Sequence, residues 1–204
     1  MTHKNSSYLI SILGVFGALI ILQAYIPMIG YIRLFPMWPA ISTIHLTVIL
    51  GGVLLGVRGG AGLGLLWGVV SLIKAYTGAT DPMTLLLFQN PVIAIVPRVA
   101  VGVVAALVFA ALSKAADNRR AAGLKMSLAG ICGALTNTLL VIAFTWLFFA
   151  GRANAVVPGA NAQNLGWLLI TAFAINAVAE AGMAAVVTPL LGLVLTDAKR
   201  RRRR

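Results

Sequence analysis

Four ionisable side chains lie inside otherwise apolar stretches of this 204-residue sequence: His45, Lys74, Arg98 and Glu180. A charge in an apolar environment is costly, so such residues mark by default a functional site or a specific partner. Four polar side chains lie at a comparable depth and can form directional hydrogen bonds: Asn90, Asn137, Thr138 and Asn176. This combination of residue types predicts a site that orients a small polar ligand.

The charged candidates also have structural interpretations, which remain open at the level of sequence. Arg98 follows Pro97 near the start of its apolar stretch, and it either pairs with Glu180 or extends to the lipid headgroups. Lys74 lies three residues from the end of its stretch, where lysine is a common interfacial anchor. The alternative for His45 is a packing role in the core.

The amides and tryptophans have similar alternatives. Asn137 and Asn176 either contact a ligand or form hydrogen bonds between helices. Trp146 and Trp167 fall where aromatic belts form at a membrane interface. Trp67 lies in the middle of its stretch and is therefore the tryptophan that we expect to line a pocket.

Motifs for catalysis are missing from the sequence. It contains no Walker A sequence, no GxSxG elbow and no HExxH motif, and His3, His45 and Cys132 are too few to build a metal site. We therefore expect no enzyme activity, no metal and no cofactor. Uphill transport would need an ATPase supplied by another subunit.

The elements that must hold these residues are membrane-spanning helices. Hydrophobic residues make up 60% of the chain and charged residues 10%, and the mean hydropathy is +0.98. The apolar runs are close to the roughly 20 residues that cross a bilayer. They predict an all-α integral membrane protein, in a single domain over residues 1–204, with six transmembrane helices at 8–26, 41–57, 61–77, 92–112, 124–150 and 167–195.

The basic residues predict the orientation of this domain. Arg33 and Arg152 lie on one side and Lys74 and Arg98 within spans, while all the other Lys and Arg residues lie on the side of the termini. By the positive-inside rule both termini are cytoplasmic, in a prokaryotic plasma membrane. The net charge of +12 then reflects orientation and contact with lipid rather than nucleic acid. We expect the basic tail at 196–204, and Arg200–Arg204 above all, to be cytoplasmic and disordered.

Connections and glycines indicate how the helices meet. The loops at 28–40, 78–91 and 151–166 are long, nearly uncharged and rich in proline, which is typical of lids and binding loops, although plain exposed loops are the alternative. Arg58–Gly60 predicts a tight turn in a helical hairpin. Gly14 and Ala18 form a small-xxx-small face that suits either internal packing or another subunit.

Two stretches resemble a known family: "TIHLTVILGGVLLGVRGGAGLGLLWGVVSLIKAYT" and "FQNPVIAIVPRVAVGVVAALVF". They are similar to the S components, the membrane-embedded substrate-binding subunits of energy-coupling factor (ECF) vitamin transporters. The resemblance covers about residues 7–195 and is greatest to the pantothenate-specific branch. S components for folate, cobalamin and pyridoxine or hydroxymethylpyrimidine share much of the scaffold.

The resemblance implies a vitamin-binding subunit that works with a transmembrane coupling subunit and two ATPases. Gly14 and Ala18 match the positions of the family's AxxxA docking face. Pantothenate carries a carboxylate, for which Arg98 is the first candidate and Lys74 the second. The low aromatic content of 8% favours a small ligand over folate or cobalamin. A stand-alone transporter or channel, and a membrane enzyme or assembly factor, are the alternative classes.

Overall fold

A computed structural model describes residues 3–26, 28–32, 40–78, 82–113 and 118–201 of the chain. Its helices are α1 (His3–Tyr25), α2 (Ile44–Thr77), α3 (Pro82–Phe88), α4 (Pro91–Leu112), α5 (Arg119–Phe149), the 3-10 helix η1 (Ala150–Arg152), α6 (Ala153–Val156) and α7 (Leu165–Arg201). A two-stranded antiparallel ribbon joins β1 (Tyr31–Ile32) to β2 (Ile41–Ser42). Apart from this ribbon, the regular structure in the described part is helical.

Helix α2 is a hairpin of two helical arms rather than one straight rod. Gly56 has φ 77° and ψ −170° inside it, a conformation that residues with a side chain rarely adopt. The arms pack so closely that a Cβ atom at Gly60 would lie 2.9 Å from the Cα atom of Gly52. The chain therefore reverses at Gly56, slightly earlier than the expected turn at Arg58–Gly60, because Gly56 takes the positive φ and the following residues are already helical.

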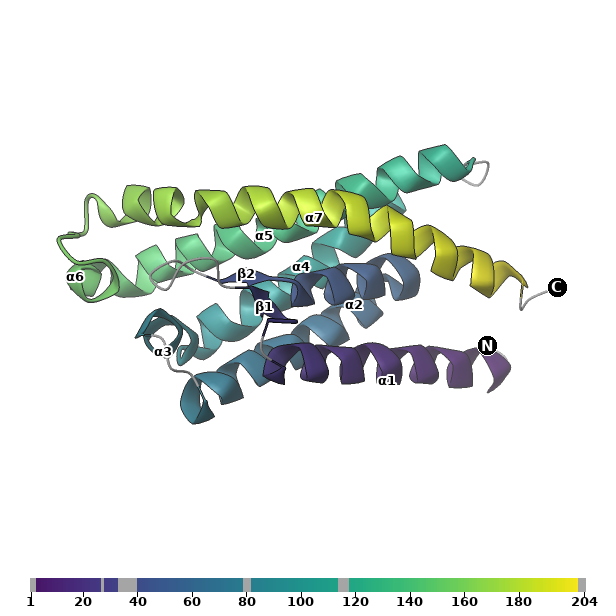
Figure 1. Cartoon of the computed structure of the whole chain (residues 1–204), viewed down its shortest axis with the longest axis horizontal. Coiled ribbons are helices and arrows are strands. Elements are labelled where there is room, and N and C mark those ends of the chain that lie inside the picture. The colour runs from purple at the N-terminus through teal and green to yellow at the C-terminus, as the bar shows by residue number, and fades with distance from the viewer. Residues whose placement is uncertain (1–2, 27, 33–39, 79–81, 114–117, 202–204) are drawn as a thin grey trace.

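The long helices run along the longest axis of the molecule, with both termini at one end and α3 and α6 at the other (Figure 1). Asparagine caps begin two of these helices. The side chain of Asn90 accepts a hydrogen bond from the backbone of Val92 at the start of α4, and Asn118 accepts one from Ala121 at the start of α5. In both cases the cap satisfies an amide that has no partner within the helix.

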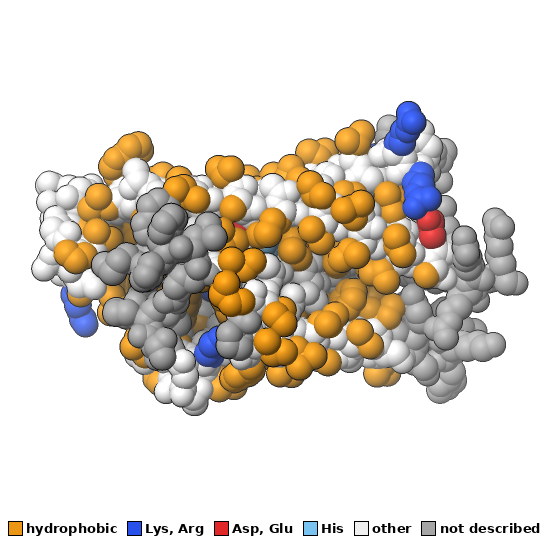
Figure 2. Space-filling view, viewed as in Figure 1, with side chains coloured by type: hydrophobic (Ala, Val, Ile, Leu, Met, Phe, Trp, Pro, Cys, Tyr) orange, Lys and Arg blue, Asp and Glu red, His pale blue; other side chains and the backbone are white. Residues whose placement is uncertain are grey.

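The surface of this bundle is apolar. Among the described residues, four helical stretches are long and apolar enough to cross a membrane: Ile44–Thr77, Pro91–Leu112, Arg119–Val156 and Leu165–Ala198. Ile10–Tyr25 of α1 is a shorter apolar helix. Large apolar side chains such as Val178 are exposed, by 75% in that case, and apolar side chains cover the middle of the face drawn in Figure 2. Such a surface suits lipid rather than water.

Glycines form the contact between α2 and α4. A Cβ atom at Gly60 or Gly64 would collide with the backbone of α4, at the carbonyl oxygens of Gly102 and Arg98 respectively. At Gly68 it would lie 2.7 Å from the Cα atom of Ile95. The two helices thus meet backbone to backbone, which is the close approach that small residues permit between membrane helices. We call this contact the glycine seam.

The segments between the long helices carry more structure than the sequence predicts. The expected loops at 78–91 and 151–166 contain α3 and α6, and the loop at 28–40 contains β1. Helix α7 continues to Arg201, so Arg200 and Arg201 are helical rather than disordered. The rest of the basic tail, and the loop residues Arg33, Pro36, Trp38 and Pro39, lie outside the described residues.

Candidate functional site

Buried polar side chains come together from α2, α4, α5 and α7. Six side chains of the expected types are buried in the interior: His45, Arg98, Asn137, Thr138, Asn176 and Glu180. Buried polar groups in folded proteins normally have hydrogen-bond partners, and exceptions call for an explanation such as a ligand. We call this set the polar layer.

Two close contacts between helices define the level of the layer. A Cβ atom at Gly133 of α5 would lie 3.0 Å from Ile49 of α2 and 3.3 Å from Ala105 of α4. His45 and Asn137 each lie one helical turn beyond these contacts, toward the end with α3, and Arg98 lies two turns beyond Ala105 (Figure 1). Side chains distant in the sequence are thus brought to adjacent levels of the bundle.

The second contact places α7 at the same level. A Cβ atom at Gly130 of α5 would lie 2.7 Å from the carbonyl oxygen of Ala184 in α7. Toward the end with α6, Glu180 of α7 lies one turn from this contact, at the same height as Ala134 of α5. Asn176 lies two turns from it, at the same height as Thr138. The carboxyl group and the two amides therefore share, with His45 and Arg98, the half of the bundle nearer to α3 and α6.

Arg98 is held between aromatic rings. Its side chain is only 3% exposed, and the guanidinium carbon lies 5.1 Å from the ring centre of Trp67 and 4.4 Å from that of Phe88. One guanidinium nitrogen donates a hydrogen bond to the carbonyl oxygen of Ile93 at 2.8 Å, and Nε has no hydrogen-bond partner within the described ranges. Aromatic faces stabilise a cation without neutralising it, so the charge remains available to an anion.

The structural alternatives for Arg98 receive little support. Glu180 is near enough to act on Arg98 electrostatically, but the described residues form no ion pair between them. The guanidinium is buried among rings rather than extended to the surface. The cation is therefore positioned inside the bundle without a direct carboxylate contact.

Tyr31 connects the ribbon to α2 beside this arginine. The indole nitrogen of Trp67 donates to the hydroxyl of Tyr31 at 3.2 Å, and that hydroxyl lies 3.4 Å from Oγ of Ser71. The ammonium of Lys74 lies 4.9 Å from the Tyr31 ring centre and donates a hydrogen bond to the carbonyl oxygen of Ala24 in the last turn of α1. Lys74 thus holds α1 and Tyr31 in place next to Trp67.

Glu180 and His45 meet where β2 leads into α2. The backbone amide of Ser42 donates to Oε1 of Glu180 at 2.8 Å, beside the N-terminus of α2, where the helix dipole favours an anion. The ring of His45 is fully buried and lies close to the backbone of Ser42 and Glu180, but neither ring nitrogen meets the distance and angle of a hydrogen bond with any of the described residues. Packing alone does not satisfy these two nitrogens.

The asparagines differ in their surroundings. Oδ1 of Asn137 is buried without a hydrogen-bond partner among the described residues, whereas Asn176 is buried and interacts with another group. Asn90 is half-buried and its side-chain oxygen serves as the cap of α4. Asn137 and Asn176 therefore belong to the polar layer, while Asn90 acts first as a structural residue.

Sequence reasoning missed two aromatic contributors to this site. Tyr31 and Phe88 lie in short elements between the long helices, and each reaches its polar partner only through the fold. The one sequence signal was the unusual content of prolines and aromatic residues in those segments. The residues that the structure describes hold no cluster of His, Cys, Asp and Glu that could bind a metal.

A separate surface lies on α1. Gly14 and Ala18 are exposed, and a Cβ atom at Gly14 would meet nothing within 4 Å. Gly17 instead faces inward, where a Cβ atom would lie 3.2 Å from Leu66 of α2. The small-residue face is therefore not used for packing within the described chain.

A known family of membrane proteins matches most of this chain. The chain matches the family described as ECF transporter, substrate-specific component, over residues 9–192. The chain therefore belongs to this family of membrane transporter components, and it is a multi-pass protein of the bacterial plasma membrane.

Two curated relatives point to one branch of the family. The pantothenic acid transporter PanT of Lactococcus lactis subsp. cremoris (strain MG1363) is 32% identical over 210 residues, which cover 96% of this chain and 97% of that protein. The pantothenate transporter PanT of Leuconostoc mesenteroides subsp. mesenteroides (strain ATCC 8293) is 32% identical over 203 residues, covering 96% of this chain and 95% of that protein. The similarity extends over nearly the whole length of all three chains.

Proposed function

We propose that this chain captures pantothenate as the substrate-binding subunit of an ECF importer. The observation that carries the proposal is Arg98, a buried cation flanked by Trp67 and Phe88 with no direct carboxylate partner among the described residues. A guanidinium in a water-poor site binds a carboxylate strongly and can contact both of its oxygens. Two relatives named as pantothenate transporters support this choice of anion.

The remaining site residues have distinct roles in this proposal. Asn137 and Asn176 form hydrogen bonds with the amide of the vitamin, since an asparagine side chain offers both a donor and an acceptor. Trp67 packs against the ligand and fixes Arg98. Asn90 and Lys74 support the site by capping α4 and by holding Tyr31.

In the membrane, the chain crosses six times with both termini in the cytoplasm. The hairpin at Gly56 supports this topology, because it divides α2 into two antiparallel arms and gives six helical segments with α1, α4, α5 and α7. Both termini lie at the end of the bundle that also carries the start of α5, with the basic Arg119, Arg120 and Lys125 (Figure 1). That distribution follows the positive-inside rule.

Energy comes from partners in this proposal. A transmembrane coupling subunit docks on the Gly14 and Ala18 face of α1, and two ATPase subunits bind the coupling subunit. The exposure of both small residues supports a docking surface, since small residues let another helix approach closely.

The direct test is a binding titration of the purified protein in detergent or nanodiscs against a panel of vitamins. We expect saturable binding of pantothenate, and no comparable binding of folate, cobalamin, pyridoxine or hydroxymethylpyrimidine. Co-expression with the coupling subunit and both ATPases should yield one complex that transports pantothenate on addition of ATP. Tighter binding of another vitamin, or of none, contradicts the proposal.

A further inference from the structure

Beyond Arg98, the polar layer contains a second group of side chains with a different chemistry. Glu180 is 4% exposed, and its Oε1 accepts a hydrogen bond from the backbone of Ser42. His45 follows three residues after Ser42, and its two buried ring nitrogens have no hydrogen-bond partner in the part of the chain that the structure describes. We call Glu180 and His45 the acceptor pair.

The fold holds the acceptor pair in a fixed position. The Ser42 amide ties Glu180 of α7 to the end of β2, and the antiparallel ribbon fixes β2 through its pairing with β1. His45 lies in the first turn of α2, directly after β2, with its ring near the backbone of Glu180. Two helices and the ribbon therefore bring one carboxylate and one imidazole to the same place.

The chemistry of the pair selects a hydroxyl group rather than an anion. A carboxylate accepts hydrogen bonds and repels a second carboxylate, whereas a neutral imidazole offers one donor and one acceptor. A hydroxyl donates one hydrogen bond and accepts others, so two hydroxyls together can donate to the carboxylate and to one imidazole nitrogen and accept from the imidazole N–H. Leaving such buried nitrogens unpaired is costly, and a ligand hydroxyl removes that cost.

We propose that Glu180 and His45 form a subsite for the hydroxyl-bearing end of the ligand and so fix the direction in which it binds. The inference rests on the proposed function, because pantothenate carries its carboxylate at one end and its two hydroxyls at the other. The carboxylate contacts Arg98 and the hydroxyls contact the acceptor pair. The repulsion between Glu180 and the carboxylate excludes the reversed orientation.

The test combines Glu180→Gln with three ligands. These are pantothenate, pantothenol, which has an alcohol in place of the carboxylate, and the analogue of pantothenate with hydrogen in place of both hydroxyls. Glutamine keeps an oxygen for the Ser42 amide but removes the charge. We expect the variant to lose about tenfold or more in affinity for pantothenate and pantothenol alike, as is typical when a hydrogen bond to a charged group is lost. The analogue without hydroxyls should bind the variant and the unaltered protein equally.

Two controls keep the test decisive. The thermal stability of Glu180→Gln in detergent shows whether the variant folds, and His45→Leu provides a second variant that should give the same ligand pattern. Equal losses for all three ligands, or no loss for any, overturn the acceptor pair as a hydroxyl subsite. Failure of the unaltered protein to bind pantothenate instead overturns the proposed function and this inference with it.

Discussion

The two ends of the bundle differ in whether their buried polar atoms have hydrogen-bond partners among the described residues. In the polar layer, both nitrogens of His45, Nε of Arg98 and Oδ1 of Asn137 are buried without hydrogen-bond partners among the residues that the structure describes. At the end with the termini, Ser127 of α5 donates to the carbonyl oxygen of Ala185 in α7 at 2.7 Å, and Thr196 donates to Gly192 at 2.7 Å. The first end is incomplete by itself, while the second satisfies most of its own polar groups.

The bond from Ser127 to Ala185 has a clear cause. Pro189 lies inside α7 and has no backbone N–H, so the carbonyl oxygen of Ala185 lacks its usual donor four residues later. Ser127 supplies that donor from the neighbouring helix. The hydroxyl of Thr188 is a local exception, because it is buried without a partner.

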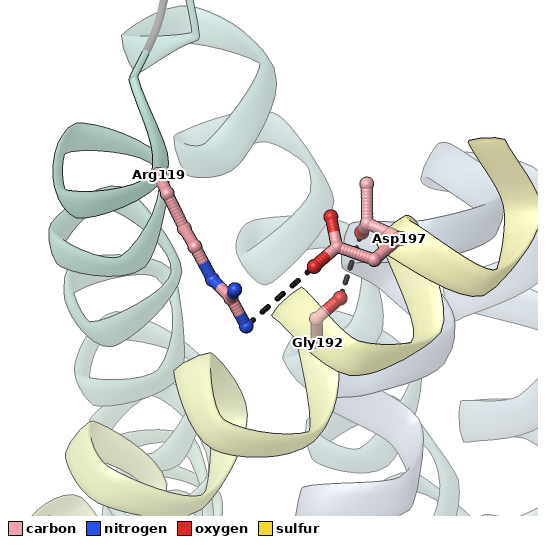
Figure 3. A network of polar contacts seen from close by, with 4 residues as sticks. Arg119, Gly192 and Asp197 are labelled. Atoms are coloured by element: carbon pink, nitrogen blue, oxygen red, sulfur yellow. Dashed lines mark hydrogen bonds and ion pairs between the residues drawn. The ribbon is translucent and has the colours of Figure 1, made fainter. Parts of the chain in front are cut away.

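Near the termini an exposed ion pair also joins the two helices. Arg119 at the start of α5 lies 3.5 Å from Asp197 of α7, beside the Gly192 carbonyl (Figure 3). Both ends contain polar side chains, so polar content alone does not locate a ligand site in a membrane bundle. The informative feature is the buried polar atom that the protein leaves unpaired.

The strongest expected effect comes from Arg98→Ala. Removing the cation should cost about 2 to 5 kcal/mol in pantothenate binding, which is roughly thirty-fold or more in affinity. Pantothenol should lose much less, because it has no carboxylate. Arg98→Lys should restore little, since lysine lacks the planar pair of donors. Equal losses for both ligands in a calorimetric titration would show that Arg98 has a structural role instead. Arg152→Ala, which removes an exposed arginine, is the control.

A second change separates ligand binding in the polar layer from docking on α1. Gly14→Leu should abolish co-purification with the coupling subunit and ATP-driven uptake, while pantothenate binding by the isolated protein stays unchanged. Nothing in the described chain obstructs a side chain there, so the variant should fold. Gly17→Leu is the control, because its side chain would collide with Leu66 and should lower stability instead. Normal transport by Gly14→Leu would show that α1 docks elsewhere.

A smaller effect is expected for Ser127→Ala. The change leaves the carbonyl oxygen of Ala185 without a donor and should lower stability by about 1 kcal/mol. Thr196→Ala should cost less, because the backbone amide of Thr196 already serves the Gly192 carbonyl within the helix. Thermal unfolding in detergent distinguishes the two variants, and pantothenate affinity should be unchanged in both. A tenfold loss of affinity in Ser127→Ala would contradict the division between the two ends.

The smallest effect should follow from Arg119→Ala. The side chains of Arg119 and Asp197 are 69% and 44% exposed, so water screens their attraction. Such surface pairs contribute about 0 to 1 kcal/mol. Thermal unfolding at low and high salt should hardly differ between this variant and the unaltered protein. A large salt-dependent loss would show that the ion pair holds α5 to α7.

Much of the fold followed from the sequence because lipid imposes simple rules. Long apolar runs with few charges predicted the helices, and the rarity of buried charges singled out His45, Arg98 and Glu180. The reversal at Gly56 was harder to locate, because three glycines close together could each take a positive φ. The two-residue strands were too short to show any periodicity.

The aromatic half of the site could not be predicted for a different reason. Phe88 and Tyr31 approach Arg98 and Trp67 from segments whose positions depend on how α3 and the ribbon fold over the bundle. Nothing local to either residue encodes that approach. Lys74 likewise looked like a ligand contact or an anchor to lipid, and its contact with the Tyr31 ring appears only in three dimensions.

The glycine seam has a consequence for the accuracy of the site. Because α2 and α4 touch through their backbones, sliding one along the other by a single residue would bring a Cβ atom against the opposite chain. The seam therefore fixes the position of α2 relative to α4 along the bundle axis. Gly64 faces the carbonyl oxygen of Arg98 in this seam, and Trp67 follows Gly64 within one helical turn. Main-chain contacts thus set the relative height of the backbones that carry Trp67 and Arg98, so a ligand has only their side chains to adjust.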